Sequence, residues 1–137
     1  MNTDMRLAEQ ELTERIIGTF FAVYNELGYG FLESVYENAM CIALLEAGLE
    51  VARQVPFAVE FHGQIIGDYR ADLIVGNRII LEIKAIQALG SAQEAQLLNY
   101  LKASRLEVGL LLNFGPKAEF KRKVLSAKNP RSSAPSA

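Results

Sequence analysis

The chain has 137 residues, half of them hydrophobic, and its formal net charge at neutral pH is −2. This length supports one domain with a substantial core and is too short for two ordinary domains, so we expect a single domain over residues 1–128. No apolar run approaches a membrane span, the first ten residues lack a signal-peptide layout, and one cysteine excludes an internal disulfide, so we expect a soluble, cytoplasmic protein.

Two helices are predicted before any strand. Residues 5–27 place apolar side chains at three- and four-residue steps, which is typical of an amphipathic helix, and Gly28 is suited to end it. A second helical pattern runs from about residue 32 to residue 47 and stops at Gly48. Cys41 lies in this second pattern and is predicted to be a buried small side chain rather than a reactive thiol.

A meander of three strands is predicted after the helical pair. Alternating apolar residues indicate a strand over 51–61, and residues 62–64 read as a turn. A second strand is predicted over about 65–75, with a bend near residues 67–68, and a third over about 79–85.

The remaining residues predict a helix, a buried strand and a short final helix. Ser91-Ala92-Gln93-Glu94 fits a capping box that opens a helix to about Ser104, and the apolar run 107–114 suits a buried strand. Pro116 can start a last short helix, and the polar residues 129–137 predict a disordered tail. The predicted fold class is α/β, in the order αα-βββ-α-β with a short C-terminal helix and a mixed sheet flanked by helices.

Three charged residues, Asp72, Glu82 and Lys84, interrupt the second and third predicted strands, where ionised groups are expensive to bury. A two-residue loop at Gly76-Asn77 would place Asp72 and Glu82 on different faces of the hairpin. A three-residue loop at 76–78 would place them opposite each other, with Lys84 on the same face.

The three-residue loop also segregates the apolar side chains, and we favour it for that reason. It pairs Leu73 with Leu81 and Ala71 with Ile83 on one apolar face. On the other face it pairs Ile74 with Ile80 and Arg70 with Lys84.

Two carboxylates directly opposite each other repel, which is unfavourable in a purely structural sheet. A divalent cation removes the objection, and Mg²⁺ or Mn²⁺ can bind through a few carboxylates while taking up phosphate oxygens. Lys84 can then stabilise phosphate charge or help to orient a metal-activated water. The alternative is an exposed hairpin face with a structural pair between Lys84 and a carboxylate.

Asp72 followed by Glu82-Ile83-Lys84 resembles the signature of the PD-(D/E)xK nuclease superfamily, an acid on one strand and Glu-x-Lys on the next. Gln96 and Tyr100 match the Gln-x-x-x-Tyr motif of RecB-like nucleases in that superfamily, and residues 30–36 are similar to the Gly-x-x-Glu-x-x-Tyr motif of the small bacterial GxxExxY family. The similarity covers roughly residues 10–125. One departure is Ala71, where the superfamily name has proline.

The resemblance implies a nuclease-type site that binds Mg²⁺ or Mn²⁺. The implied metal ligands are Asp72, Glu82, Glu33 and the backbone carbonyl of Ile83. The implied catalytic set is Glu33, Asp72, Glu82, Lys84, Gln96 and Tyr100. In this set Lys84 assists the attacking water, and Gln96 and Tyr100 orient the phosphate or Lys84. The only histidine, His62, lies in a predicted turn and is excluded from catalysis.

Two functions follow from these observations. The first is a Mg²⁺-dependent phosphodiesterase acting on DNA, which the intact charged set favours. The second is a catalytically silent nuclease-fold module that binds nucleic acid or protein. Residues 1–50 carry nine acids against two arginines, whereas residues 117–131 carry six basic residues and one acid, so a nucleic acid would be met mainly by the C-terminal side. A homodimer could supply further contact area.

Overall fold

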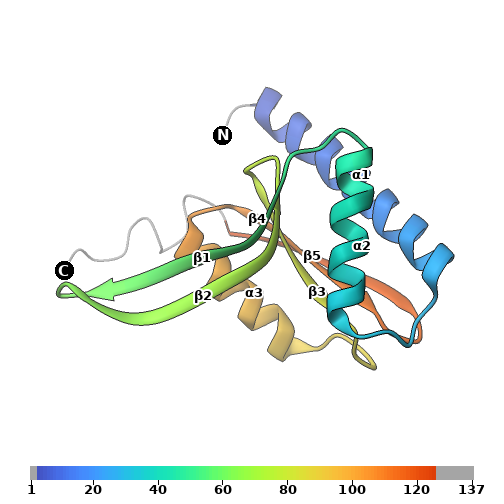
Figure 1. Ribbon diagram of the computed structural model, residues 1–137. Coiled ribbons are helices and arrows are strands. Elements are labelled where there is room, and N and C mark those ends of the chain that lie inside the picture. The colour runs from blue at the N-terminus through green and yellow to red at the C-terminus, as the bar shows by residue number, and fades with distance from the viewer. Residues whose placement is uncertain (1–2, 126–137) are drawn as a thin grey trace.

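The computed structural model describes residues 3–125, and the predicted tail at 129–137 lies outside them (Figure 1). The described part contains three helices: α1 (Thr3–Leu27), α2 (Glu33–Glu46) and α3 (Ser91–Ser104). Its five strands are β1 (Val51–Phe61), β2 (Gln64–Val75), β3 (Ile79–Lys84), β4 (Val108–Phe114) and β5 (Ala118–Val124). The order αα-βββ-α-ββ confirms the predicted α/β class and the first seven predicted elements.

The five strands form one mixed sheet in the order β1-β2-β3-β4-β5, in which β3 and β4 are parallel and the other neighbours are antiparallel. Helices α1 and α2 pack on one face of the sheet and α3 on the other, while the β1–β2 hairpin extends beyond the sheet as an arm (Figure 1). Each face has its own buried apolar cluster, and Cys41 lies in the one beneath α1 and α2, as predicted. No helix among residues 3–125 is long and apolar enough to cross a membrane.

The predicted C-terminal helix is wrong, because residues 118–124 form strand β5. This strand pairs antiparallel with β4 along its whole length, from Val108 opposite Val124 to Phe114 opposite Ala118. Every residue of β4 is buried, so its outer edge needs a hydrogen-bonding partner, and β5 supplies it. Pro116 lies in the turn between the two strands.

The predicted three-residue loop between β2 and β3 is confirmed, because Val75 pairs with Ile79, Ile74 with Ile80 and Leu73 with Leu81. The predicted bend in β2 is a bulge beside Gly67, where the register with β1 shifts. The predicted continuation of the β2–β3 pairing past Leu73 and Leu81 is wrong, because the ladder ends there.

The start of α3 differs by one residue from the predicted capping box. Its N-cap is Gly90 rather than Ser91, and the Gln93 side chain accepts a hydrogen bond from the Gly90 N–H at 2.8 Å. The reciprocal half of the box needs a side chain at the N-cap, which glycine lacks. The helix nevertheless covers the predicted residues and presents Leu97 and Leu101 to the sheet.

Candidate active site

The site lies where β2 and β3 diverge. Asp72 Oδ2 accepts a hydrogen bond from the Ile83 N–H at 2.7 Å, and Glu82 Oε2 accepts one from the Asp72 N–H at 3.1 Å. These bonds from side-chain oxygens to the backbone of the opposite strand take over from the backbone pairing of β2 with β3, which ends at Leu73 and Leu81. The two acids are therefore brought together, as predicted, by bonds to each other's strand rather than by regular pairing.

The same point interrupts the alternation of side chains along the hairpin. Leu73 packs in the cluster beneath α1 and α2, whereas Ala71 packs against α3, although two residues apart on a regular strand share a face. Gln54, which would face Asp72 across the hairpin, has a left-handed backbone with φ of 48°. The predicted shared face of Ala71 and Ile83 is therefore wrong, because the hairpin twists at Gln54 and Asp72.

Burial makes ionisation of both acids costly. Burial is the main cause that raises the pKa of Asp72 to about 6, and the charges of Glu37 and Glu33 add to it. Glu82 is 3% exposed, and burial followed by the charge of Asp72 raises its pKa to about 8. Lys84 lowers both pKa values by a smaller amount. The acids thus lie close together without enough positive charge to balance them.

The Lys84 side chain extends from the end of β3 to helix α3. Its Nζ donates a hydrogen bond to Gln96 Oε1 at 3.2 Å. One turn later on α3, the ring of Tyr100 packs edge-on against Tyr69 of β2, with 5.2 Å between centroids. Burial, and then the charges of Glu82 and Asp72, raise the pKa of Tyr100 to about 12. The structure therefore brings Gln96 to Lys84 and Tyr100 near the two acids.

Glu33 is the first residue of α2 and is exposed, and its charge contributes to the raised pKa of Asp72 and of Glu82. The loop before it is held by Tyr36, which is fully buried. The Tyr36 hydroxyl donates to the Gly28 carbonyl at 2.7 Å and accepts from the Phe31 N–H at 3.2 Å. The tyrosine of the Gly-x-x-Glu-x-x-Tyr stretch thus fixes the loop from which Glu33 starts the helix.

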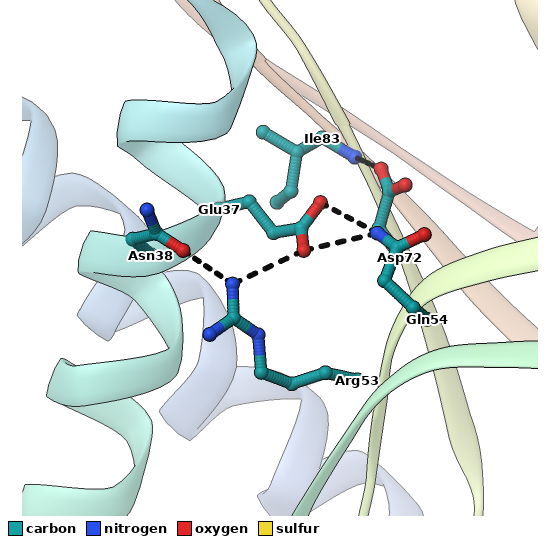
Figure 2. Close-up of polar contacts among 6 residues, drawn as sticks. All are labelled: Glu37, Asn38, Arg53, Gln54, Asp72 and Ile83. Carbon is teal, nitrogen blue, oxygen red and sulfur yellow. Dashed lines mark hydrogen bonds and ion pairs between the residues drawn. The ribbon is translucent and has the colours of Figure 1, made fainter.

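Sequence reasoning missed Glu37, one turn after Glu33 on α2. Its carboxylate accepts two hydrogen bonds from Gln54 Nε2, at 2.9 and 3.0 Å, and forms an ion pair with Arg53 at 3.3 Å (Figure 2). The charge of Glu37 raises the pKa of Asp72 more than the charge of Glu33 does. The spacing of four residues on one helix face was a signal that both acids point the same way.

The donor set is of the kind that hard divalent cations bind. No group of three or more His, Cys, Asp or Glu side chains within the described residues is arranged to hold a metal by itself. An ion at Asp72 and Glu82 would therefore need backbone, water or phosphate oxygens as well, which is common for Mg²⁺. The raised pKa values agree with such a fit, because a cation would supply the positive charge that the two acids lack.

A solved structure shares this fold. The crystal structure of SSO0001 superposes with a TM-score of 0.54 at 19% sequence identity, covering 74% of this chain and 55% of that one. This chain thus corresponds to just over half of that protein's length. No curated protein matches the sequence.

The model of the PD-(D/E)XK nuclease superfamily matches residues 10–123, a range that includes both strands of the site, α2 and α3. The chain therefore belongs to the PD-(D/E)XK nuclease superfamily.

Proposed function

We propose that this protein is a cytoplasmic, metal-dependent nuclease that hydrolyses phosphodiester bonds in DNA, and that it belongs to the GxxExxY group within its superfamily. One observation carries the proposal: Asp72, Glu82 and Lys84 converge where β2 and β3 diverge, with Gln96 bonded to Lys84. A structural hairpin has no need of a buried acid and a half-buried acid that oppose each other's ionisation.

Asp72 and Glu82 would hold Mg²⁺ or Mn²⁺, with the carbonyl of Ile83 as a further ligand. The exposed carboxylate of Glu33 is not grouped with the two acids in the described structure, so it would join them only by turning toward the ion. When bound, the cation lowers the pKa of a coordinated water and neutralises charge on the phosphate. The hydrogen bond from the Ile83 N–H fixes the carboxylate of Asp72, and the Asp72 N–H fixes that of Glu82. Both acids are thereby preorganised before the ion arrives.

Lys84 would orient the attacking water or stabilise the charge that develops on the phosphate. Gln96 Oε1 holds Lys84 Nζ by accepting one hydrogen bond from it, and two N–H donors remain for the substrate. Tyr100, whose pKa is raised to about 12, keeps its hydroxyl proton at neutral pH and can donate a hydrogen bond to a phosphate oxygen. The negative charges of the site make binding of a polyanion dependent on the cation.

A second candidate is a nuclease-fold module that binds nucleic acid or protein without cutting. The uneven charge favours it, because nine acids in residues 1–50 weaken an independent grip on DNA. A homodimer would enlarge the contact area under either function. The two functions can be distinguished because only the enzyme cleaves DNA.

Cleavage of single-stranded, duplex and branched DNA in Mg²⁺ or Mn²⁺ tests the proposal. We expect Glu82→Ala and Lys84→Ala to lower the rate by at least about 100-fold, because each removes a group that acts on the reacting phosphate. Matched controls are Glu46→Ala on α2 and Lys102→Ala on α3, two exposed residues away from the site, which should cut like the wild type. No cleavage with either metal, or equal rates in all variants, would contradict the enzymatic function.

A further inference from the structure

Three loops beside the candidate active site line an open pocket of about 240 Å³. It is lined by residues 29–31 between α1 and α2, residues 85–87 after β3, and residues 114–116 at the end of β4. The parallel strands β3 and β4 both end here, and the carboxyl edge of such strands is where open α/β sheets bind ligands. The pocket therefore lies at a favourable place for a substrate group.

Two residues that line the pocket are close in the sequence to residues of the candidate active site. Ala85 follows Lys84 directly, and Phe31 precedes Glu33 by two residues. Consecutive Cα atoms are about 3.8 Å apart, so the Cα of Ala85 lies about 3.8 Å from that of Lys84, and the Cα of Phe31 lies within roughly 8 Å of that of Glu33. A group bound in the pocket would be next to the phosphate on which Lys84 acts.

Each of the three loops is held in place by a dedicated side chain. The Tyr36 hydroxyl bonds to the first loop at Gly28 and Phe31. The buried Asn113 side chain accepts from the Ile86 N–H at 2.9 Å and donates to the Ile86 carbonyl at 3.0 Å. The Tyr24 hydroxyl makes contacts of 2.8 and 3.0 Å with the carbonyls of residues 115 and 116. The pocket is thus preformed, which lowers the cost of binding.

The chemistry of the lining suits a nucleobase. Tyr29 is 62% exposed and Phe31 49% exposed, and both line the same pocket, so two aromatic side chains are accessible to a ligand there. Aromatic faces stack on bases of any sequence, and the exposed side-chain amide of Gln87 can both donate to and accept from base edges. Lys117, exposed and next to the lining residue Pro116, offers positive charge for a neighbouring phosphate.

From these observations, and resting on the proposed nuclease function, we infer that the pocket binds an unpaired nucleobase adjacent to the scissile phosphate. A base can enter only when it is not stacked and paired in a duplex, so the preferred substrate is single-stranded DNA or an unpaired end. Tyr29 and Phe31 form the stacking surface, and the pocket reads the presence of a base rather than its identity.

Binding and crosslinking of short single-stranded DNA, with Ca²⁺ in place of Mg²⁺ to slow hydrolysis, test the inference. A single 5-iodouracil is placed at successive positions and crosslinked peptides are identified by mass spectrometry. We expect one position to crosslink to the peptide that contains Tyr29 and Phe31. Tyr29→Leu and Phe31→Leu, which keep apolar bulk but remove the ring, should weaken single-strand binding by about 5- to 100-fold and leave blunt duplex binding within about twofold.

The control is Phe61→Leu, since Phe61 is 58% exposed at the far end of the β1–β2 arm and should bind like the wild type. Wild-type binding by both leucine variants, crosslinks confined to other peptides, or no single-strand binding by the wild type would overturn the inference. These failures differ from failure of the proposed function, which is absence of cleavage in Mg²⁺ and Mn²⁺. A protein that cuts DNA but crosslinks elsewhere would keep its function and lose this pocket.

Discussion

The acid pair makes the metal-free protein sensitive to pH. Because burial raises the pKa of Glu82 to about 8 and that of Asp72 to about 6, the native state holds protons that the unfolded chain releases at neutral pH. This contribution to stability is complete at acidic pH and is lost as the pH rises through these values. We expect the free energy of unfolding in urea, without divalent cations, to fall by at least about 1 kcal/mol between pH 5.5 and 8.5.

Glu82→Gln is the control for this effect, because glutamine keeps the acceptor for the Asp72 N–H and cannot ionise. Its loss of stability over the same range should be clearly smaller than that of the wild type. An equal loss in both proteins would show that other groups cause the pH dependence.

Glu37 acts on the neighbouring acid through its charge. Because it contributes to the raised pKa of Asp72, removing its charge in Glu37→Gln should lower that pKa, by less than about one unit. Titration of the Asp72 carboxyl carbon by NMR measures the shift. Glu46→Gln, a change of the same kind on the exposed side of α2, should leave the Asp72 pKa unchanged. A raised or unchanged Asp72 pKa in Glu37→Gln would contradict the effect of the Glu37 charge on Asp72.

At the scale of elements, the loop from β3 to α3 determines where Gln96 and Tyr100 are placed. It passes so close to Gly115 that a Cβ there would lie 2.1 Å from the Ile86 carbonyl oxygen. Gly115→Ala must therefore displace the loop, and we expect it to destabilise the protein by about 1–3 kcal/mol in urea unfolding. Cleavage should fall with it, because α3 follows this loop.

Gly18 provides the matched alanine substitution. It lies within α1, and a Cβ there would meet no atom within 4 Å. Gly18→Ala should therefore stabilise the protein by about 0.5–1 kcal/mol, through the higher helix propensity of alanine. Equal effects at both glycines would contradict the close approach of the loop to Gly115.

For the whole molecule, sequence patterns predicted the order of helices and strands better than they predicted the places where a strand gains or loses its partner. Segregation of apolar side chains was sufficient to choose the loop that aligns Leu73 with Leu81, because register and burial are coupled. Strand β5 was missed because two lysines and one arginine dilute its alternation of apolar residues, and because its formation depends on the open edge of β4. A pattern read along the chain does not contain that partner.

The candidate site shows the same division. Asp72, Glu82 and Lys84 were predicted from their places on two strands, whereas Gln96 and Tyr100 were predicted from the resemblance to the Gln-x-x-x-Tyr motif. The end of the β2–β3 ladder was missed because side-chain oxygens replace backbone partners there, and the left-handed Gln54 gives no signal in the sequence. Glu37 differs from these, because its spacing of four residues from Glu33 was a signal, although its partners Arg53 and Gln54 are brought to it only by the folded hairpin.

A crystal of the protein soaked in Mn²⁺ tests the metal site most directly. If Asp72 and Glu82 are the ligands of a catalytic cation, anomalous density should appear between their carboxylates, and it should be absent from a Glu82→Ala crystal soaked in the same way. The Asp72 and Glu82 oxygens should then lie about 2.0–2.2 Å from the ion, a little longer than is ideal for Mg²⁺. Density elsewhere in the molecule, or density that persists in Glu82→Ala, would contradict the account.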